Sequence, residues 1–220
     1  MEVDLGIFGG MGLLAETHFL RLFLKECASR IPSNYTGNSH THIDERKMPS
    51  YICFANPKRP SRSRHIFFDE ESPEKLLCAD IKFLGTLGVK CIAIPCMTVH
   101  YYLESMREHT DAHIISILDH VGIAIDRLPD GPTLVICSEA TSKVRMLDRY
   151  TNRDLIYTQS WELVRNIIDG VKKGDDLTRL GKHLKSVMCG YVNVVLACTE
   201  LSIILDHENY TSINLSLIHI

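Results

Sequence analysis

Two cysteines occupy equivalent positions in two similar segments of this 220-residue chain. The segment GVKCIAIPCMTV, which contains Cys96, aligns with GYVNVVLACTEL, which contains Cys198, and in both an apolar, strand-like run ends at the cysteine. Ligands bind at the carboxyl ends of strands in open parallel sheets, and the N-terminus of a following helix favours the thiolate over the thiol. A thiolate on one face of a carbon acid can remove a proton while a thiol on the other face returns one. The repeat therefore predicts an acid/base pair that inverts a carbon centre and titrates as a coupled unit.

The remaining cysteines are interpreted as small hydrophobic residues, because that is the commoner role of a free cysteine; they are Cys27, Cys53, Cys78, Cys91, Cys137 and Cys189. In a non-secreted chain of this size we expect free thiols rather than disulfides. The nearest approach to metal-ligand spacing is His40 and His42 with Asp44, in a polar loop, and the chain has no CxxC or HExxH motif. Two histidines do not make a closed site, so no metal is expected.

The bulk composition is that of an ordinary globular protein, with 45% hydrophobic residues, 23% charged residues and a net charge of −3. Such a balance gives no reason to expect nucleic acid or a membrane surface as a partner. The first residues, MEVDLGIFGG, lack the basic region of a signal peptide, and the longest apolar run is interrupted by polar residues, so no membrane span is expected. We therefore expect a cytoplasmic protein.

Short apolar runs alternate with amphipathic stretches of helical length, which is typical of βαβ units and a parallel sheet. The expected strands are 3–8, 50–55, 89–94, 112–116, 133–137, 154–158 and 192–196. The expected helices are 13–29, 73–87, 98–108, 117–128, 142–150, 162–171, 175–188 and 199–205. Segments 30–50 and 56–72 are rich in Pro, Ser, Asn and charge and are expected to be loops.

The order of these elements indicates two similar halves. The turn Pro129-Asp130-Gly131-Pro132 marks the switch into the second half, and both halves begin with a strand, a turn of small residues and a helix. We expect an N-terminal α/β domain formed by 1–115 with 209–220, which contains Cys96, and a second α/β domain formed by 116–208, which contains Cys198.

Several other patterns have competing interpretations. The run GMGLLA that begins at Gly10 matches the GxGxxA turn of dinucleotide-binding proteins, but no acidic residue ends the next strand, so we prefer close approach of the backbone to a small anion. His100 could be a base, although one turn beyond Cys96 it is expected to support the helix or orient a neighbour. A basic cluster without interleaved aromatic residues favours an anionic small-molecule loop or a solvated face over a nucleic-acid site; it comprises Lys58, Arg59, Arg62 and Arg64.

Five motifs together resemble those of one enzyme family. GIFGGMGLLAETHF resembles the GGMGPxAT signature of the PLP-independent aspartate/glutamate racemases, IPCMTVH resembles their PCNTxH motif, and ACTEL resembles their GCTEL motif. NPKRPSR, at 56–62, resembles their NPxxPDR loop, and EAT, at 139–141, resembles their GT turn. The motifs occur in the family's order and extend over nearly the whole chain.

The resemblance implies an α/β fold of two pseudo-symmetric flavodoxin-like domains, each with a parallel sheet flanked by helices, a substrate cleft between them, and a homodimer. It implies racemisation of an acidic amino acid, aspartate or glutamate, with no PLP, metal or other cofactor. Cys96 and Cys198 match the catalytic thiols, and Arg62 matches an arginine that binds a substrate carboxylate. The other positions matched to substrate contact are Met11, Met97, Thr98, Thr141, Thr199 and Glu200.

The chain departs from the family pattern at several positions. Met97 stands where the motif has an asparagine that is expected to hydrogen-bond the substrate, and Ser61 stands where an aspartate would orient Arg62. Leu13 replaces a proline, and Ala140 and Ala197 replace glycines. Related proteins of this fold include hydantoin racemases, maleate isomerases and single-thiol decarboxylases, and the presence of both cysteines argues against the last. A homologue that binds its ligand without turnover is the remaining alternative.

Overall fold

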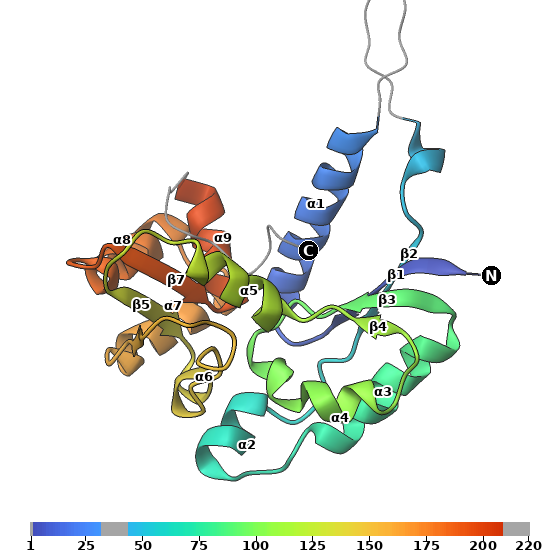
Figure 1. Cartoon of the computed structure of the whole chain (residues 1–220), viewed down its shortest axis with the longest axis horizontal. Coiled ribbons are helices and arrows are strands. Elements are labelled where there is room, and N and C mark those ends of the chain that lie inside the picture. The colour runs from blue at the N-terminus through green and yellow to red at the C-terminus, as the bar shows by residue number, and fades with distance from the viewer. Residues whose placement is uncertain (1, 32–43, 209–220) are drawn as a thin grey trace, which may run out of the picture.

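The computed structural model describes residues 2–31 and 44–208 and contains two parallel β-sheets, each flanked by helices (Figure 1). The predicted α/β fold class is therefore confirmed. The histidines His40 and His42 lie outside the described residues. Within the described part of the chain no helix is long and apolar enough to cross a membrane.

The two sheets repeat the same strand order. In the first, β1 (Val3–Gly9), β2 (Tyr51–Ala55), β3 (Val89–Ala93) and β4 (His113–Ile114) lie in the order β2-β1-β3-β4. In the second, β5 (Thr133–Cys137), β6 (Leu155–Tyr157) and β7 (Asn193–Ala197) lie in the order β6-β5-β7. Thus β1, β2 and β3 correspond to β5, β6 and β7, all seven predicted strands are present, and β3 and β7, the strands before the two cysteines, are equivalent.

The helices cover both faces of each sheet. The first lobe, as we call the first sheet with its helices, contains α1 (Leu13–Arg30), α2 (Arg62–Phe68), α3 (Glu74–Thr86), α4 (Leu103–Arg107) and the 3-10 helices η1 (Glu45–Lys47) and η2 (Thr98–Tyr102). The second lobe contains α5 (Ile117–Asp126), α6 (Glu139–Lys143), α7 (Trp161–Lys173), α8 (Leu177–Met188) and α9 (Thr199–Glu208).

Apolar side chains of these helices form the cores. In the first lobe, α3 supplies Leu77, Ile81 and Leu84 to one face of the sheet, and α1 supplies Phe19 to the other. In the second lobe, α5 packs on one face, while α7, α8 and α9 pack on the other. Because both faces are covered, every residue of β5 and of β7 is buried, as is usual for parallel strands.

Four predicted segments differ from the structure for local reasons. The predicted helix 142–150 is wrong. Helix α6 begins earlier, because the Ser138 side chain caps it by accepting a hydrogen bond from the backbone N–H of Thr141. It ends before Arg145, whose φ of +45° is not helical. The predicted loop 56–72 contains α2, which Ser61 caps in the same way, and the predicted loop 30–50 contains η1. The predicted helix 98–108 is divided into η2 and α4.

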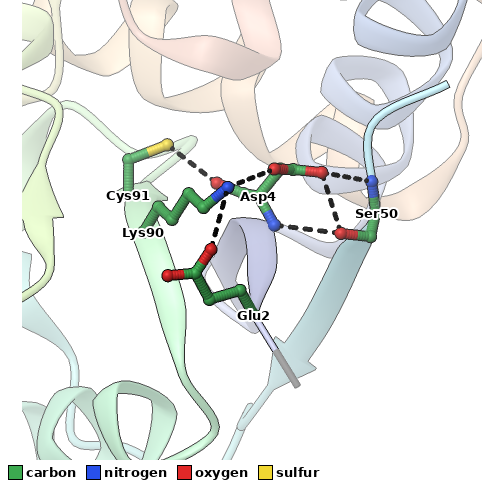
Figure 2. Close-up of polar contacts among 5 residues, drawn as sticks. All are labelled: Glu2, Asp4, Ser50, Lys90 and Cys91. Atoms are coloured by element: carbon green, nitrogen blue, oxygen red, sulfur yellow. Dashed lines mark hydrogen bonds and ion pairs between the residues drawn. The ribbon is translucent and has the colours of Figure 1, made fainter. Parts of the chain in front are cut away.

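A polar network at the amino-terminal edge of the first sheet joins three strands (Figure 2). The Asp4 carboxylate accepts hydrogen bonds from the backbone N–H and the hydroxyl of Ser50 and from Lys90, and these contacts lower its pKa, the Ser50 backbone most strongly. The Cys91 thiol donates to the Asp4 carbonyl at 3.1 Å. Cys91 is therefore engaged in a structural contact, at the edge of the sheet opposite to the one where ligands are expected.

Candidate active site

The strand register places each predicted catalytic cysteine beside the turn that follows a central strand. In the first sheet Ile7 pairs with Ala93, so the turn after β1 leaves the sheet next to the Cys96 loop. In the second sheet Cys137 pairs with Ala197, so the turn after β5 leaves next to Cys198. Cys96 is buried and Cys198 is half-buried. Both thiols are thus at the carboxyl ends of parallel strands, where this fold class binds ligands.

The Cys198 thiol lies against a buried carboxylate. Its Sγ donates to Oε2 of Glu200 at 3.0 Å, and the Thr199 hydroxyl donates to the same oxygen at 3.3 Å. On the other side, Lys172 Nζ is 3.8 Å from Oε1 of Glu200. Burial and the Glu200 charge raise the pKa of Cys198 well above its usual value, although Lys172 opposes them. These effects oppose the expected preference for thiolate at a helix N-terminus and favour the protonated form of Cys198.

The glycine turn between β1 and α1 is surrounded on three sides by polar groups. The Glu16 carboxylate accepts the backbone N–H of Gly10 at 2.7 Å. A Cβ on Gly10 would lie 2.4 Å from the backbone nitrogen of Asn56. A Cβ on Gly12, whose φ is +125°, would lie 2.7 Å from Oε1 of Glu200. The turn therefore brings the first lobe against the Glu200 carboxylate that holds the Cys198 thiol.

Three hydroxyl groups join the lobes near Cys96. The Thr98 hydroxyl is hydrogen-bonded to those of Thr141 and Ser138, at 3.1 and 3.2 Å, and the latter two are 3.0 Å apart. Thr98 follows Cys96 by two residues, whereas Ser138 is the N-cap of α6, directly after β5, and Thr141 lies within α6. Because a hydroxyl both donates and accepts, this cluster can redirect its protons towards the oxygen of a ligand.

Arg62 lies at the start of α2, on the boundary with the second lobe. Lys143 of α6 donates to the carbonyl oxygens of Ile66 and Phe67 at 3.0 and 3.1 Å, which holds the end of α2 against the second lobe; the two helices lie together in Figure 1. The Arg62 Nε is buried and has no hydrogen-bond partner among the described residues. A buried donor without an acceptor is costly, and an anionic ligand would supply the acceptor.

Two predicted substrate contacts are occupied by methionines that fill the cores. Met97 is 2% exposed and packs in the apolar cluster of the second lobe with residues of α5. Met11 is 5% exposed and packs in the core of the first lobe. These positions leave little surface of either side chain for a ligand, and Met97 instead anchors the Cys96 loop in the opposite lobe.

His100 orients the Cys96 loop, as expected from its place one turn beyond the cysteine. Its Nε2 accepts the backbone N–H of Ile117 at 3.2 Å, so Nδ1 bears the proton and donates to the Cys96 carbonyl at 2.9 Å. Burial lowers the pKa of His100, which keeps the ring neutral. Both ring nitrogens are thereby committed to the backbone, and neither is available as a base for a substrate.

The sequence interpretation missed three contributors to this region. Ser138 completes the hydroxyl cluster, and its position three residues before Thr141 is a helix-capping signal that could have identified it. Lys172 faces Glu200 from α7, and no sequence motif marks it. Arg59, assigned only to a basic cluster, is buried in an ion pair with Asp80. No group of three or more His, Cys, Asp or Glu side chains is placed to hold a metal within residues 2–31 and 44–208.

The family model described as Asp/Glu/Hydantoin racemase matches residues 9–219. The broad specificity amino-acid racemase RacX of Bacillus subtilis (strain 168) is 23% identical over 211 residues, which is 92% of this chain and 88% of that protein.

Solved racemases share the fold. Picrophilus torridus aspartate racemase aligns with a TM-score of 0.77 and 21% identity, over 98% of this chain and 90% of that one. Glutamate racemase from Francisella tularensis, solved in complex with D-glutamate, aligns with a TM-score of 0.61 and 19% identity, over 99% of this chain and 78% of that one. At these identities the likeness establishes the two-domain flavodoxin-like architecture.

Proposed function

The chain belongs to the Asp/Glu/hydantoin racemase family, and on that premise we propose that it racemises an acidic amino acid, aspartate or glutamate, by proton transfer between Cys96 and Cys198 without PLP or metal. The observation that carries the proposal is the equivalence of the two thiols. Cys96 follows the carboxyl end of β3, and Cys198 follows the carboxyl end of β7, the corresponding strand of the second sheet.

In the proposed reaction the Cα–H bond breaks as the thiolate on one face forms an S–H bond. The thiol on the opposite face then loses its proton as a new Cα–H bond forms with inverted configuration. Atoms and charge balance, because one thiolate and one thiol are present before and after the transfer. The raised pKa of Cys198 and its hydrogen bond to Glu200 support its role as the proton donor in one direction, and the reverse direction uses it as the base.

Arg62 and the hydroxyl cluster support binding of a carboxylate substrate. The unpartnered Nε of Arg62 would bind one carboxylate. The hydroxyls of Thr98, Thr141 and Ser138 would bind the other and stabilise negative charge that develops when the α-proton leaves. We assign Glu200 to the support of Cys198 rather than to direct substrate contact, because its carboxylate is already bonded to the thiol.

Exchange of the α-proton into deuterated water, followed by NMR, tests the proposal on both enantiomers of aspartate and glutamate. We expect exchange by the unmodified protein and its loss in Cys96→Ser and Cys198→Ser. Cys189→Ser is the matched control, because Cys189 is exposed and lies between α8 and the amino end of β7, whereas Cys198 follows the carboxyl end of that strand. Exchange that persists in both active-site variants would remove the thiols from the mechanism.

The same assay separates the alternatives that the family allows. Turnover of a hydantoin or of maleate, without exchange of either acidic amino acid, would assign the chain to the related isomerases. Measurable binding of aspartate or glutamate without exchange would indicate a homologue that keeps the ligand site but not the reaction, to which Met97 in place of an amide would contribute.

We further propose that the protein is a homodimer, as the family resemblance implies. Sedimentation equilibrium should then give a mass near twice the 24.9 kDa of the chain. A single species at the mass of one chain, at concentrations above those used for the activity assay, would contradict the dimer but would leave the assignment of the thiols unaffected.

A further inference from the structure

Arg59 is wholly buried at the base of the loop that ends at Arg62. Its side chain is 0% exposed. Nη1 donates to the carbonyl of Gly9 at 2.6 Å, Nε donates to Oδ2 of Asp80 at 2.7 Å, and the guanidinium lies 4.1 Å from the centre of the Phe8 ring. One side chain therefore joins the end of β1, the loop after β2 and the helix α3.

The Asp80 carboxylate extends this junction to the glycine turn. The same Oδ2 that accepts from Arg59 also accepts from Nδ2 of Asn56 at 2.8 Å. The backbone of Asn56 in turn lies against Gly10 so closely that no Cβ would fit. The buried pair thus fixes two loops at once: the turn that faces Glu200 and the loop that leads to Arg62.

The loop lacks the residue that would otherwise orient Arg62. Ser61 stands in place of the aspartate of the family motif, and its side chain caps α2 by accepting the backbone N–H of Arg64 at 3.3 Å. The motif leaves the position of Arg59 unspecified. Burial is the main cause that lowers the pKa of Arg59, and the nearby positive charge of Arg62 lowers it further, whereas Asp80 raises it. The two arginines are therefore close enough for their charges to interact.

We infer that Arg59 is a positioning residue: through Gly9 and Asp80 it fixes the loop that presents Arg62 to the substrate carboxylate. The inference rests on the proposed function for the identity of that substrate. The planar fork of arginine donates to two acceptors in fixed directions, which lysine cannot reproduce with one ammonium group. Methionine at this position would fill the space but would remove the donors that Arg59 supplies to the Gly9 carbonyl and to Asp80, leaving Asp80 with its bond from Asn56 but without the cation of Arg59.

The test compares Arg59→Met and Arg59→Lys with Arg64→Met, a matched control that removes an exposed arginine of α2 paired with Glu70. We expect Arg59→Met to raise KM for the acidic amino acid at least about tenfold with kcat per folded enzyme little changed, because a displaced Arg62 loses binding shared by the ground state and the transition state. Arg59→Lys should be intermediate and Arg64→Met should resemble the unmodified protein.

Chemical rescue distinguishes positioning from a general effect on folding. Ethylguanidinium added to Arg59→Ala should recover part of the lost KM effect, since it can occupy the vacated space and restore the two donors. A fall in the folded fraction with unchanged KM, or an equal rise of KM in Arg64→Met, would overturn the inference.

Calorimetric titration with aspartate and glutamate keeps this inference separate from the proposed function. If the unmodified protein binds the amino acid but shows no turnover, the proposed function fails. The Arg59 inference is then tested by the Kd for the amino acid, which should rise in Arg59→Met by the factor expected for KM. Binding by Arg59→Met with unmodified affinity would overturn the Arg59 inference alone.

Discussion

Replacement of Glu200 by glutamine should lower the pKa of Cys198. The substitution keeps the shape of the side chain and a hydrogen-bond acceptor but removes the negative charge 3.0 Å from Sγ. At an effective dielectric constant of about 20, two unit charges at this separation interact by roughly 5 kcal/mol, and each pKa unit corresponds to about 1.4 kcal/mol. Burial and Lys172 act on the thiol in both proteins, so the Glu200 charge is the contribution that changes, and the Cys198 pKa should be lower in the variant.

Alkylation by iodoacetamide, resolved by residue in a mass spectrometer and measured as a function of pH, reports this pKa without any need for turnover. The midpoint for Cys198 should move to lower pH in Glu200→Gln and to higher pH in Lys172→Met, because Lys172 stabilises negative charge at the site. Glu139→Gln is the matched control, since that carboxylate also belongs to the second lobe but pairs with Arg165. An unchanged or higher midpoint in Glu200→Gln would refute the electrostatic account.

Three further substitutions test the surroundings of the thiols. Arg62→Ala should weaken acidic substrates far more than neutral ones in steady-state kinetics, and equal losses would contradict its assignment to a carboxylate. Gly12→Ala should lower the free energy of unfolding in urea by about 1–3 kcal/mol through backbone strain, and the new Cβ should also displace Glu200. Gly174→Ala is the control, because Gly174 has φ +78° and open space around it, so the substitution strains the backbone without touching another residue. Equal effects of the two variants on Cys198 alkylation would argue against the contact between residue 12 and Glu200. Burial lowers the pKa of His100 in the folded protein below that of the same histidine in the unfolded chain. As pH falls through about 6.5, the unfolded chain therefore binds a proton before the folded protein does, and the free energy of unfolding should decrease below that pH. His100→Gln should flatten this decline in thermal unfolding, and an unchanged slope would assign it to other groups.

The parts of the fold that were predicted correctly are specified by local sequence. The strand 133–137 coincides with β5 because a run of five apolar or β-branched residues has no helical periodicity and is bounded by a Pro-containing turn and a serine. The positions of Cys96 and Cys198 at strand ends follow from the same kind of signal. Repetition of that signal was enough to predict that the halves are equivalent, which the common strand order bears out.

The errors occur where short helices depend on capping rather than on periodicity. α2 and α6 contain 7 and 5 residues, too few for an amphipathic pattern, and each begins at a serine whose side chain accepts a backbone N–H. The helix expected after Thr98 is interrupted because the buried His100 ring holds the Cys96 carbonyl and the start of α5 together. Tertiary contacts of this kind override the helical preference of the segment.

The site was predicted residue by residue, but the contacts among its residues were not. Glu200 was matched to a motif, yet its bond to Cys198 depends on how α9 begins, and its partner Lys172 comes from another helix. The Arg59–Asp80 pair joins a loop to α3, and in the sequence Arg59 could not be distinguished from the exposed basic residues around it. Such pairings depend on the three-dimensional placement of elements that are separate in sequence.

The two thiols have equivalent places in the fold but different surroundings, and the proposed reaction requires that difference. Cys198 is bonded to a carboxylate that favours the protonated form. No hydrogen bond to the Cys96 sulfur is formed by residues 2–31 and 44–208, and the loop of Cys96 is bordered by the uncharged hydroxyls joined to Thr98. A two-base transfer with one mobile proton fails if both thiols are protonated or both are ionised. The repeat of the sheets supplies two equivalent strand ends. In the proposed reaction, the hydrogen bond from Cys198 to Glu200 favours Cys198 as the thiol that donates a proton.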